Sequence, residues 1–328
     1  MKLPRRRFLH LAAGAAVLPV VSRIAGAQTY PSRPITVIVP YPAGGGADSV
    51  FRVIAERMRS FLGQPIVIEN VAGGSGSIGT GRVARAVPDG YTLGIGNWST
   101  HVGNGAMYAL PYNVLTDFDP VALHQVFYLI LVAKKALPAN NLKELIAWLK
   151  ANPDKAFLGT PGVGSQGHLA GTLFQSITGT RFQHVPYRSV SLAMQDLIAG
   201  QIDLIFADPS GVAPVRAGSV KAFAVTAGHR LPAVPDIPTA EEAGLSGLLL
   251  ANWNGIFAPR GTPKDIIGKL NGAVTSTLAD PSVVQKLTDL GSEIPPREQR
   301  TPDAVAALQK AEIEKWWPII KAANIKGE

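Results

Sequence analysis

Three glycine-rich segments, each lying between a strand-like run and a helix-like run, constrain what this chain can fold into. With their preceding strands they span 35–48, 66–79 and 157–167. A helix start leaves backbone N–H groups without partners and carries partial positive charge. Glycine lets that backbone approach a ligand closely, so each junction is a potential anion-binding site. One junction would suggest a nucleotide, whereas three predict a small anion held from several sides.

The first 27 residues have the pattern of an export signal. Three consecutive arginines (5–7) precede a short apolar run over 9–21, and the Ala-Gly-Ala sequence at 25–27 fits a cleavage site. The arginines are typical of a twin-arginine signal, although a Sec signal also carries arginines. The apolar run is shorter than the roughly 20 residues that a membrane span needs, which disfavours an uncleaved anchor. We therefore expect export and removal of the leader after Ala27.

The export signal also changes the charge of the chain. The full sequence has a net charge of +8, and the leader contributes five basic residues and no acidic one, so the remainder carries 8 − 5 = +3. No long Lys or Arg run follows residue 7, which argues against a nucleic-acid partner. The chain contains no cysteine, so disulfides and a lipid-modified cysteine are excluded.

The 301 residues that remain (328 − 27) suit two domains, and their pattern alternates short β-branched runs with helical runs. This alternation predicts an α/β fold with mostly parallel sheets flanked by helices. Strands are expected at 35–40, 66–69, 91–96, 127–133, 157–159, 202–206 and 220–226. Helices are expected at 48–61, 78–86, 142–152, 168–178, 191–198, 240–243, 264–279, 281–290 and 301–323.

Two apolar extended runs, at 127–133 and 248–259, are candidates for strands that cross between the domains. A chain that leaves the first domain and returns to it needs two such crossings. The prediction is therefore one lobe of residues 28–127 plus 251–328 and a second lobe of residues 128–250. A simple division near residue 140 is the alternative.

The glycine segments do not match the enzyme signatures that they superficially resemble. Both 74–79 and 162–167 fit G-x-G-x-x-G, but the strand that follows each lacks the acidic residue that binds ribose. No Lys-Ser or Lys-Thr pair follows them, and neither contains a G-x-S-x-G elbow. The six histidines form no close pair or His-Glu-x-x-His motif. We therefore expect no cofactor, no metal and no catalytic residue.

The glycine loops carry no Lys or Arg, so a bound anion would be held by amides and hydroxyls, with Tyr41, Ser75, Ser77 and Ser165 as candidates. Such a site suits reversible capture of a carboxylate better than that of a triphosphate. Asp48 is expected to cap its helix and so hold the amides of the first loop.

The order of its motifs identifies the chain as resembling the periplasmic solute receptors of tripartite tricarboxylate transporters, the TctC or Bug family. Single motifs are weak, but the ordered set from residue 30 to about 325 is specific. The matching runs are 30–35, 40–48, 67–74, 88–93, 162–169, 185–187, 196–203, 235–239 and 257–263.

The resemblance implies a two-lobed periplasmic-binding-protein fold of type II, with two crossing strands as hinge, that closes over a ligand. It also implies that the first and third glycine loops grip one ligand carboxylate, partly through water. The ligand-binding residues carried over are Tyr41, Pro42, Ala43, Gly44, Gly45, Gly46, Asp48, Asn70, Gly74, Ser75, Ser99, Gly162, Gly164, Ser165, His168, Tyr187 and Asp208. Ser189 and Val190 stand where the family usually has two glycines, so the pocket is expected to have a different shape.

The function implied is that of a periplasmic, monomeric receptor that delivers a small organic carboxylate to membrane permease subunits and is not an enzyme. Two alternatives remain open at this point. One is an exported enzyme that acts on a small carboxylic acid with Asp208 and His168, and the other is a metabolite receptor that feeds a sensor protein.

Overall fold

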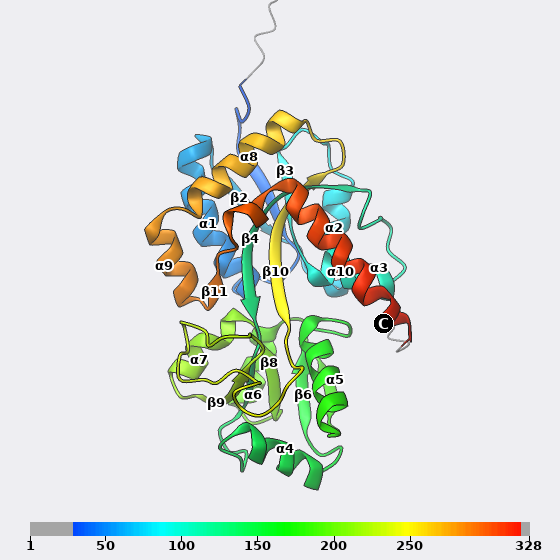
Figure 1. The fold of residues 1–328 in the computed structure, drawn as a ribbon. Helices are drawn as coiled ribbons and strands as arrows, with labels where there is room; N and C mark the ends of the chain where they lie inside the picture. The colour runs from blue at the N-terminus through cyan, green and yellow to red at the C-terminus, as the bar shows by residue number, and fades with distance from the viewer. Residues whose placement is uncertain (1–28, 323–328) are drawn as a thin grey trace, which may run out of the picture.

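The computed structural model describes residues 29–322, so the predicted export signal lies outside the described residues. Two sheets organise the chain (Figure 1). The first has six strands in the order β11-β4-β10-β3-β1-β2, and the second has five in the order β7-β6-β8-β5-β9. The first sheet contains β1 (Ile35–Val39), β2 (Ile66–Asn70), β3 (Thr92–Asn97), β4 (Phe118–Tyr128), β10 (Ala251–Pro259) and β11 (Ser292–Glu293). The second contains β5 (Ile130–Lys134), β6 (Phe157–Thr160), β7 (Gln183–Pro186), β8 (Leu204–Ala207) and β9 (Val220–Val225).

Helices cover both faces of each sheet, which is how an α/β protein buries a sheet with two apolar sides. On the first sheet, Ile35, Val37 and Val39 of β1 pack into a core with three helices, whereas Ile38 points into a core on the other face. The helices of this lobe are α1 (Gly46–Leu62), α2 (Ser77–Ala84), α3 (Asn104–Met107), α8 (Lys264–Thr277), α9 (Pro281–Asp289) and α10 (Pro302–Ala322). Those of the other lobe are α4 (Leu142–Ala151), α5 (Gln166–Thr178), α6 (Val190–Ile198) and α7 (Val212–Arg216).

The two-lobed α/β fold is confirmed, but the sheets are mixed, so the prediction of mostly parallel pairing was wrong. In the first sheet β1 pairs in parallel with β2 and β3, while β10 runs antiparallel to both β3 and β4. In the second sheet β5 runs antiparallel to β8 and β9. The reason is topological. The strands beside the two crossings, β4, β5 and β10, reach their sheet from the other lobe or leave toward it, so β5 and β10 run opposite to the neighbouring strands that precede helices.

The connections between the lobes meet at Thr226 (1% exposed). Its hydroxyl accepts a hydrogen bond from the Leu129 amide and donates one to the Leu250 carbonyl, both 2.9 Å long. Its backbone also pairs with Leu129 and Leu250. Leu129 lies between β4 and β5, and Leu250 precedes β10, so one residue ties both crossings together. The exact lobe boundaries, 127/128 and 250/251, stay a prediction.

Most predicted elements have their expected type, and two of the differences have a physical cause. The strand expected at 127–133 is interrupted at Leu129, where the chain passes from one sheet to the other. The helix expected at 240–243 is only a turn, because Gly244 at φ +87° ends it at once. Short helices at 99–107 and 212–216 were missed. Within residues 29–322, no helix combines the length and apolarity needed to cross a membrane.

Candidate functional site

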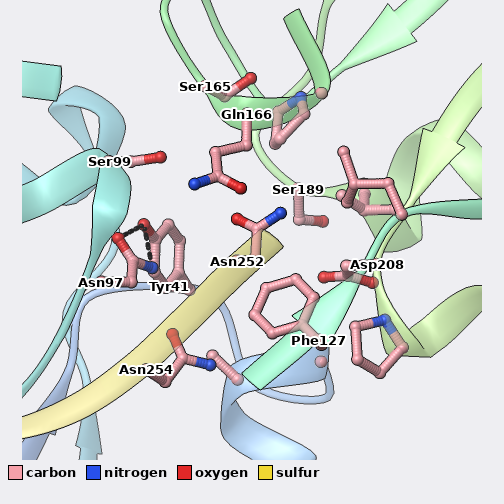
Figure 2. Close-up of a pocket in the computed structure, with 18 of the residues that line it drawn as sticks. Tyr41, Asn97, Ser99, Phe127, Ser165, Gln166, Ser189, Asp208, Asn252 and Asn254 are labelled. Atoms are coloured by element: carbon pink, nitrogen blue, oxygen red, sulfur yellow. Dashed lines mark hydrogen bonds between the residues drawn. The ribbon is translucent and has the colours of Figure 1, made fainter. Parts of the chain in front are cut away.

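A cavity of about 100 Å³ lies between the lobes, lined by residues from both sheets (Figure 2). The lining combines polar side chains with an apolar patch that includes Phe127, Leu129 and Val190. Its residues are Tyr41, Pro42, Gly45, Gly46, Ala47, Ser75, Asn97, Ser99, Gln125, Phe127, Leu129, Pro161, Ser165, Gln166, Gly167, Ser189, Val190, Ser191, Asp208, Pro209, Asn252 and Asn254. Within the described residues, this lining contains no Lys, Arg or His.

The first glycine loop brings the start of α1 to this cavity. Gly45 is the residue before the helix, so the prediction that Asp48 is the N-cap was wrong. Asp48 lies in the first turn and is 1% exposed. Its carboxylate accepts hydrogen bonds from the Gly44 amide at 2.8 Å, from Arg52 at 2.9 Å and from Asn70 at 2.9 Å. Asp48 therefore holds the loop from behind through its side chain instead of capping the helix.

The charge of Asp48 is maintained by these contacts. Burial alone would raise the pKa of the carboxyl, but the hydrogen bonds from Arg52, Gly44 and Asn70 hold that pKa below its ordinary value. Asn70 also donates to the Tyr41 carbonyl at 3.1 Å. The two predicted residues Asp48 and Asn70 thus support the loop and do not line the cavity.

The third glycine loop places the start of α5 on the opposite side of the cavity. Ser165 is the N-cap, and its hydroxyl accepts from the His168 amide. The His168 ring in turn accepts from the Gly164 amide at 3.3 Å and packs 4.4 Å from the His184 ring. Burial lowers the pKa of His168. Ser165 lines the cavity, whereas Gly164 and His168 position the loop from outside the lining.

A third helix also begins at the cavity. Ser189 is the N-cap of α6, and Ser189, Val190 and Ser191 all line the cavity. The lining therefore includes the first residues of α1, α5 and α6. Since each start carries unpaired N–H groups and partial positive charge, three helix ends make the cavity favourable for an anion without a basic side chain.

The crossing strands contribute a polar floor that the sequence analysis missed. Asn252 pairs with Phe127 and Asn254 with Gln125 across β10 and β4, and alternate residues of a strand share a face. Asn254 donates to Gln125 at 2.6 Å, and Gln125 donates to Ser292 at 2.7 Å. The signal was present, because asparagines alternate with apolar residues within a run that was read only as an apolar crossing.

Polar atoms of three of these side chains have no hydrogen-bond partner within the described residues. They are Oε1 of Gln166, Nδ2 of Asn252 and Oδ1 of Asn254. All three residues are more than nine-tenths buried, with exposures of 8%, 5% and 1%. Buried polar groups are normally paired, so unpaired groups that line one cavity indicate a place for a polar ligand.

The first glycine loop and the end of β3 together form another wall of the cavity. Asn97 and the Tyr41 hydroxyl exchange hydrogen bonds of 2.9 and 3.2 Å, and Ser99 projects into the cavity beside them (Figure 2). Burial raises the pKa of Tyr41 to about 12 despite these contacts, and the nearby Asp208 carboxylate adds to that rise. Tyr41 is therefore a neutral hydroxyl in this wall.

Asp208 stands at the end of β8 and caps a short 3₁₀ turn. Its Oδ1 accepts from the Ser210 amide at 3.0 Å and from the Ser210 hydroxyl at 2.5 Å. Burial raises the pKa of the carboxyl, and the hydrogen bonds from Ser210 offset this only in part. Its Oδ2 faces Gly46 across the lobes, 2.8 Å from where a Cβ on Gly46 would lie.

The remaining predicted residues lie around the lining. Pro42, Gly45 and Gly46 line the cavity, and so does Ser75, whose hydroxyl is 2.9 Å from that of Tyr108. Outside the lining stand Ala43, Gly44, Asp48, Asn70, Gly74, Gly162, Gly164, His168 and Tyr187. The Tyr187 hydroxyl donates to Asp196 of α6 at 2.7 Å and so holds that helix.

The arrangement does not assemble an acid–base pair. Asp208 lines the cavity, but His168 does not, and its ring nitrogen is occupied by the Gly164 amide. Among residues 29–322, no three His, Asp or Glu side chains gather as a metal site would require. What the geometry offers is hydrogen bonding, helix-end charge and burial.

Comparison with known proteins places the chain in a family. Residues 50–325 match the tripartite tricarboxylate transporter family receptor. The structure of the periplasmic binding protein BugD has a TM-score of 0.86 and 36% identity, covering 91% of this chain and 100% of that one.

Two structures from Rhodopseudomonas palustris are also similar. MatC with bound malate has a TM-score of 0.84 and 39% identity, covering 89% of this chain and 100% of that one. A second protein, solved with adipate, has a TM-score of 0.85 and 34% identity, covering 90% and 99%. The chain thus belongs to the tripartite tricarboxylate transporter receptor family.

Proposed function

We propose that the protein is a periplasmic solute receptor that captures a small organic carboxylate between its lobes and passes it to a tripartite membrane transporter. The observation that carries this proposal is the convergence of three helix starts on one cavity that has no basic side chain. A carboxylate there would accept hydrogen bonds from backbone amides of both lobes. Binding would hold the lobes together without any chemical step.

The similar structures support the ligand class, since MatC holds malate and the second R. palustris protein holds adipate. We propose that the carboxylate lies between the first and third loops, near Gly45, Gly46, Ser165 and Gln166. Because family members are receptors and the cavity brings no acid–base pair together, we propose binding and not catalysis.

The test is native mass spectrometry of residues 28–328 purified without added ligand, followed by calorimetry with a panel of carboxylates. A bound mass that matches an organic acid and is released on denaturation would support the proposal. Failure of every carboxylate to bind a well-folded sample would contradict it.

Gly46→Val gives a sharper test of the site. A Cβ on Gly46 would lie 2.8 Å from Asp208 Oδ2, so valine would keep the lobes apart and fill the amide site. Gly272→Val is the matched control, because Gly272 lies in α8 with no atom within 4 Å of a Cβ. We expect Gly46→Val to lose carboxylate binding and Gly272→Val to keep it; equal affinities would refute the placement.

Partner and location are tested in cells. If the receptor serves transport, deletion of the permease subunits should abolish uptake of the ligand. If it feeds a sensor protein instead, signalling should persist after the same deletion. Analytical ultracentrifugation should give a monomer, and fractionation should find the chain in the periplasm.

A further inference from the structure

An apolar contact between the lobes lies beside the cavity and has no part in the site described above. Its residue from the second lobe is Leu169, in the first turn of α5. Leu169 is 8% exposed and belongs to a core cluster whose other buried members, such as Trp98 and Phe257, come from the first lobe. A side chain of one lobe thus completes the core of the other.

Trp316 of α10 makes the matching contact from the first lobe. It packs against the same first-lobe cluster and also against a cluster formed mainly by the second lobe, which contains Leu158 and Phe174. Trp316 and Leu169 line one hollow of about 180 Å³ between α10 and α5. The C-terminal half of α10 and α5 lie on the same side of the molecule (Figure 1). Leu169 and Trp316 therefore join the lobes through apolar surface.

Hydrogen bonds fix the orientation of the Trp316 ring. Oε2 of Glu312 accepts from the indole nitrogen of Trp316 at 3.0 Å and from that of Trp98 at 2.9 Å. The Trp98 and Trp316 rings meet edge to face with centroids 5.5 Å apart, a favourable geometry for aromatic pairs. Trp98 lies between Asn97 and Ser99, which both line the cavity. The wall of the cavity thus holds Trp316 in place.

The same turn of α5 lines the cavity and makes the apolar contact. Gln166 lines both the cavity and the hollow, and Leu169 follows it by three residues, so the two share a face of the helix. Met107 of the first-lobe cluster also lies against Gly164 of the third loop, where a Cβ would overlap its sulfur. Because a helical turn moves as a unit, the third loop cannot leave the cavity while Leu169 stays in the first lobe's core.

On the receptor function proposed above, we infer that Leu169 and Trp316 form an apolar latch that stabilises the closed arrangement of the lobes and so holds the third loop in position. Opening would expose apolar surface of both side chains to water, which is unfavourable in proportion to the area exposed. The two side chains are uncharged, so the latch favours closure whichever acid occupies the cavity. Neither residue lines the cavity, so both are positioning residues.

The first test follows opening of the protein without any ligand. The chain has no cysteine, so Lys150→Cys in α4 and Gly268→Cys in α8, both at exposed positions, place one dye on each lobe. Single-molecule energy transfer between the dyes then gives the ratio of closed to open molecules. Leu169→Ala and Trp316→Ala should each lower this ratio by about tenfold, because each removes buried apolar contacts that only the closed arrangement makes.

Matched controls lie next to the latch residues but pack within one lobe. Leu173→Ala removes a leucine one turn further along α5 that packs against the core of its own lobe. Trp317→Ala removes the neighbouring indole, which packs against the first-lobe cluster and donates to the Val102 carbonyl at 2.9 Å. Both should lower the unfolding free energy in urea and leave the closed-to-open ratio unchanged. Leu169→Met keeps the volume of the side chain and should keep the wild-type ratio.

The second test is calorimetry with malate or adipate, whichever the wild type binds. If the unliganded wild type is mostly open, the latch variants should bind that acid about tenfold more weakly, because apparent affinity follows the closed fraction. The inference is wrong if neither the ratio nor the affinity changes in the latch variants, or if Leu173→Ala and Trp317→Ala change them equally. If the wild type binds no carboxylate, the receptor function fails, while energy transfer still decides on the latch.

Discussion

His124 makes the stability of the protein depend on pH in a predictable direction. It lies in β4 with 0% exposure, 5.7 Å from the Phe51 ring, and neither ring nitrogen has a partner within the described residues. Burial lowers its pKa to about 3. In the unfolded chain the pKa returns to about 6.5. The neutral ring therefore favours folding fully above pH 6.5, and this contribution is lost as pH falls toward 3.

The size of the effect follows from these two pKa values. At pH 5 the unfolded chain binds the proton and the folded protein does not. The unfolding free energy therefore falls by roughly 1.4 kcal/mol for each of the about 1.5 pH units between pH 6.5 and pH 5. The cost is about 2 kcal/mol relative to pH 8. Because pH 5 lies well above the folded value of about 3, the result hardly depends on that value.

Replacement of His124 by leucine removes this dependence. His124→Leu should flatten the curve of unfolding free energy against pH by about 1.4 kcal/mol per unit between pH 6 and 4.5. At pH 7.5 the variant should be as stable as the wild type or more so, since an apolar side chain replaces unpaired buried nitrogens.

The assay is urea unfolding followed by tryptophan fluorescence at half-unit steps from pH 4.5 to 8. His101→Leu provides a comparison, because the pKa of His101 is also about 3 but its Nδ1 is 2.9 Å from the Thr100 hydroxyl. It should flatten the curve equally while lowering stability at pH 7.5. Parallel curves for the wild type and His124→Leu would refute the reasoning, because they would mean that unfolding takes up no proton at this site.

Three further predictions test other parts of the structure. Thr226→Val should lower the unfolding free energy by about 1–3 kcal/mol in urea titrations, because the lost hydroxyl leaves two buried backbone groups unpaired. Asp48→Ala should weaken carboxylate binding about tenfold in calorimetry, because it frees the Gly44 amide and loosens the first loop; unchanged affinity would exclude that role. Tyr108→Phe removes the 3.2 Å bond from its hydroxyl to the Val163 carbonyl across the lobes. It should raise the ligand off-rate severalfold in stopped-flow traces while unfolding free energy stays within about 0.5 kcal/mol.

The α/β class and the positions of the glycine loops could be predicted from the sequence, because both depend on local signals. A strand followed by glycine and a helix fixes a junction within a few residues, and the observed starts of α1 and α5 lie within two residues of the expected ones. The chain length and the two apolar crossing runs predicted two lobes, and the family resemblance implied the same arrangement.

The alternation of asparagines in β10 was a local signal, but their meeting with Gln125 in one polar floor depends on a non-local pairing. Asn252 and Gln125 are more than 120 positions apart, and they share a wall only because β10 pairs with β4. Asp48 was misplaced because an acid near a helix start caps the helix or lies in its first turn, and the contact that Asp48 makes with the distant Asn70 is not visible in the local sequence. Such non-local pairings are not encoded in residue type.

The way the lobes meet explains why a ligand can control their closure. The described contacts across the cleft include the Tyr108 to Val163 hydrogen bond and the 2.6 Å pair between His229 and Glu293. These lie outside the cavity lining and are partly or largely exposed, so each contributes little. A ligand shifts an equilibrium only by its differential affinity for the two states. On the function proposed above, an anion that contacts helix starts from both lobes would have that difference, because opening would separate α1 from α5. We therefore expect the ligand to govern closure more than the contacts at the rim do.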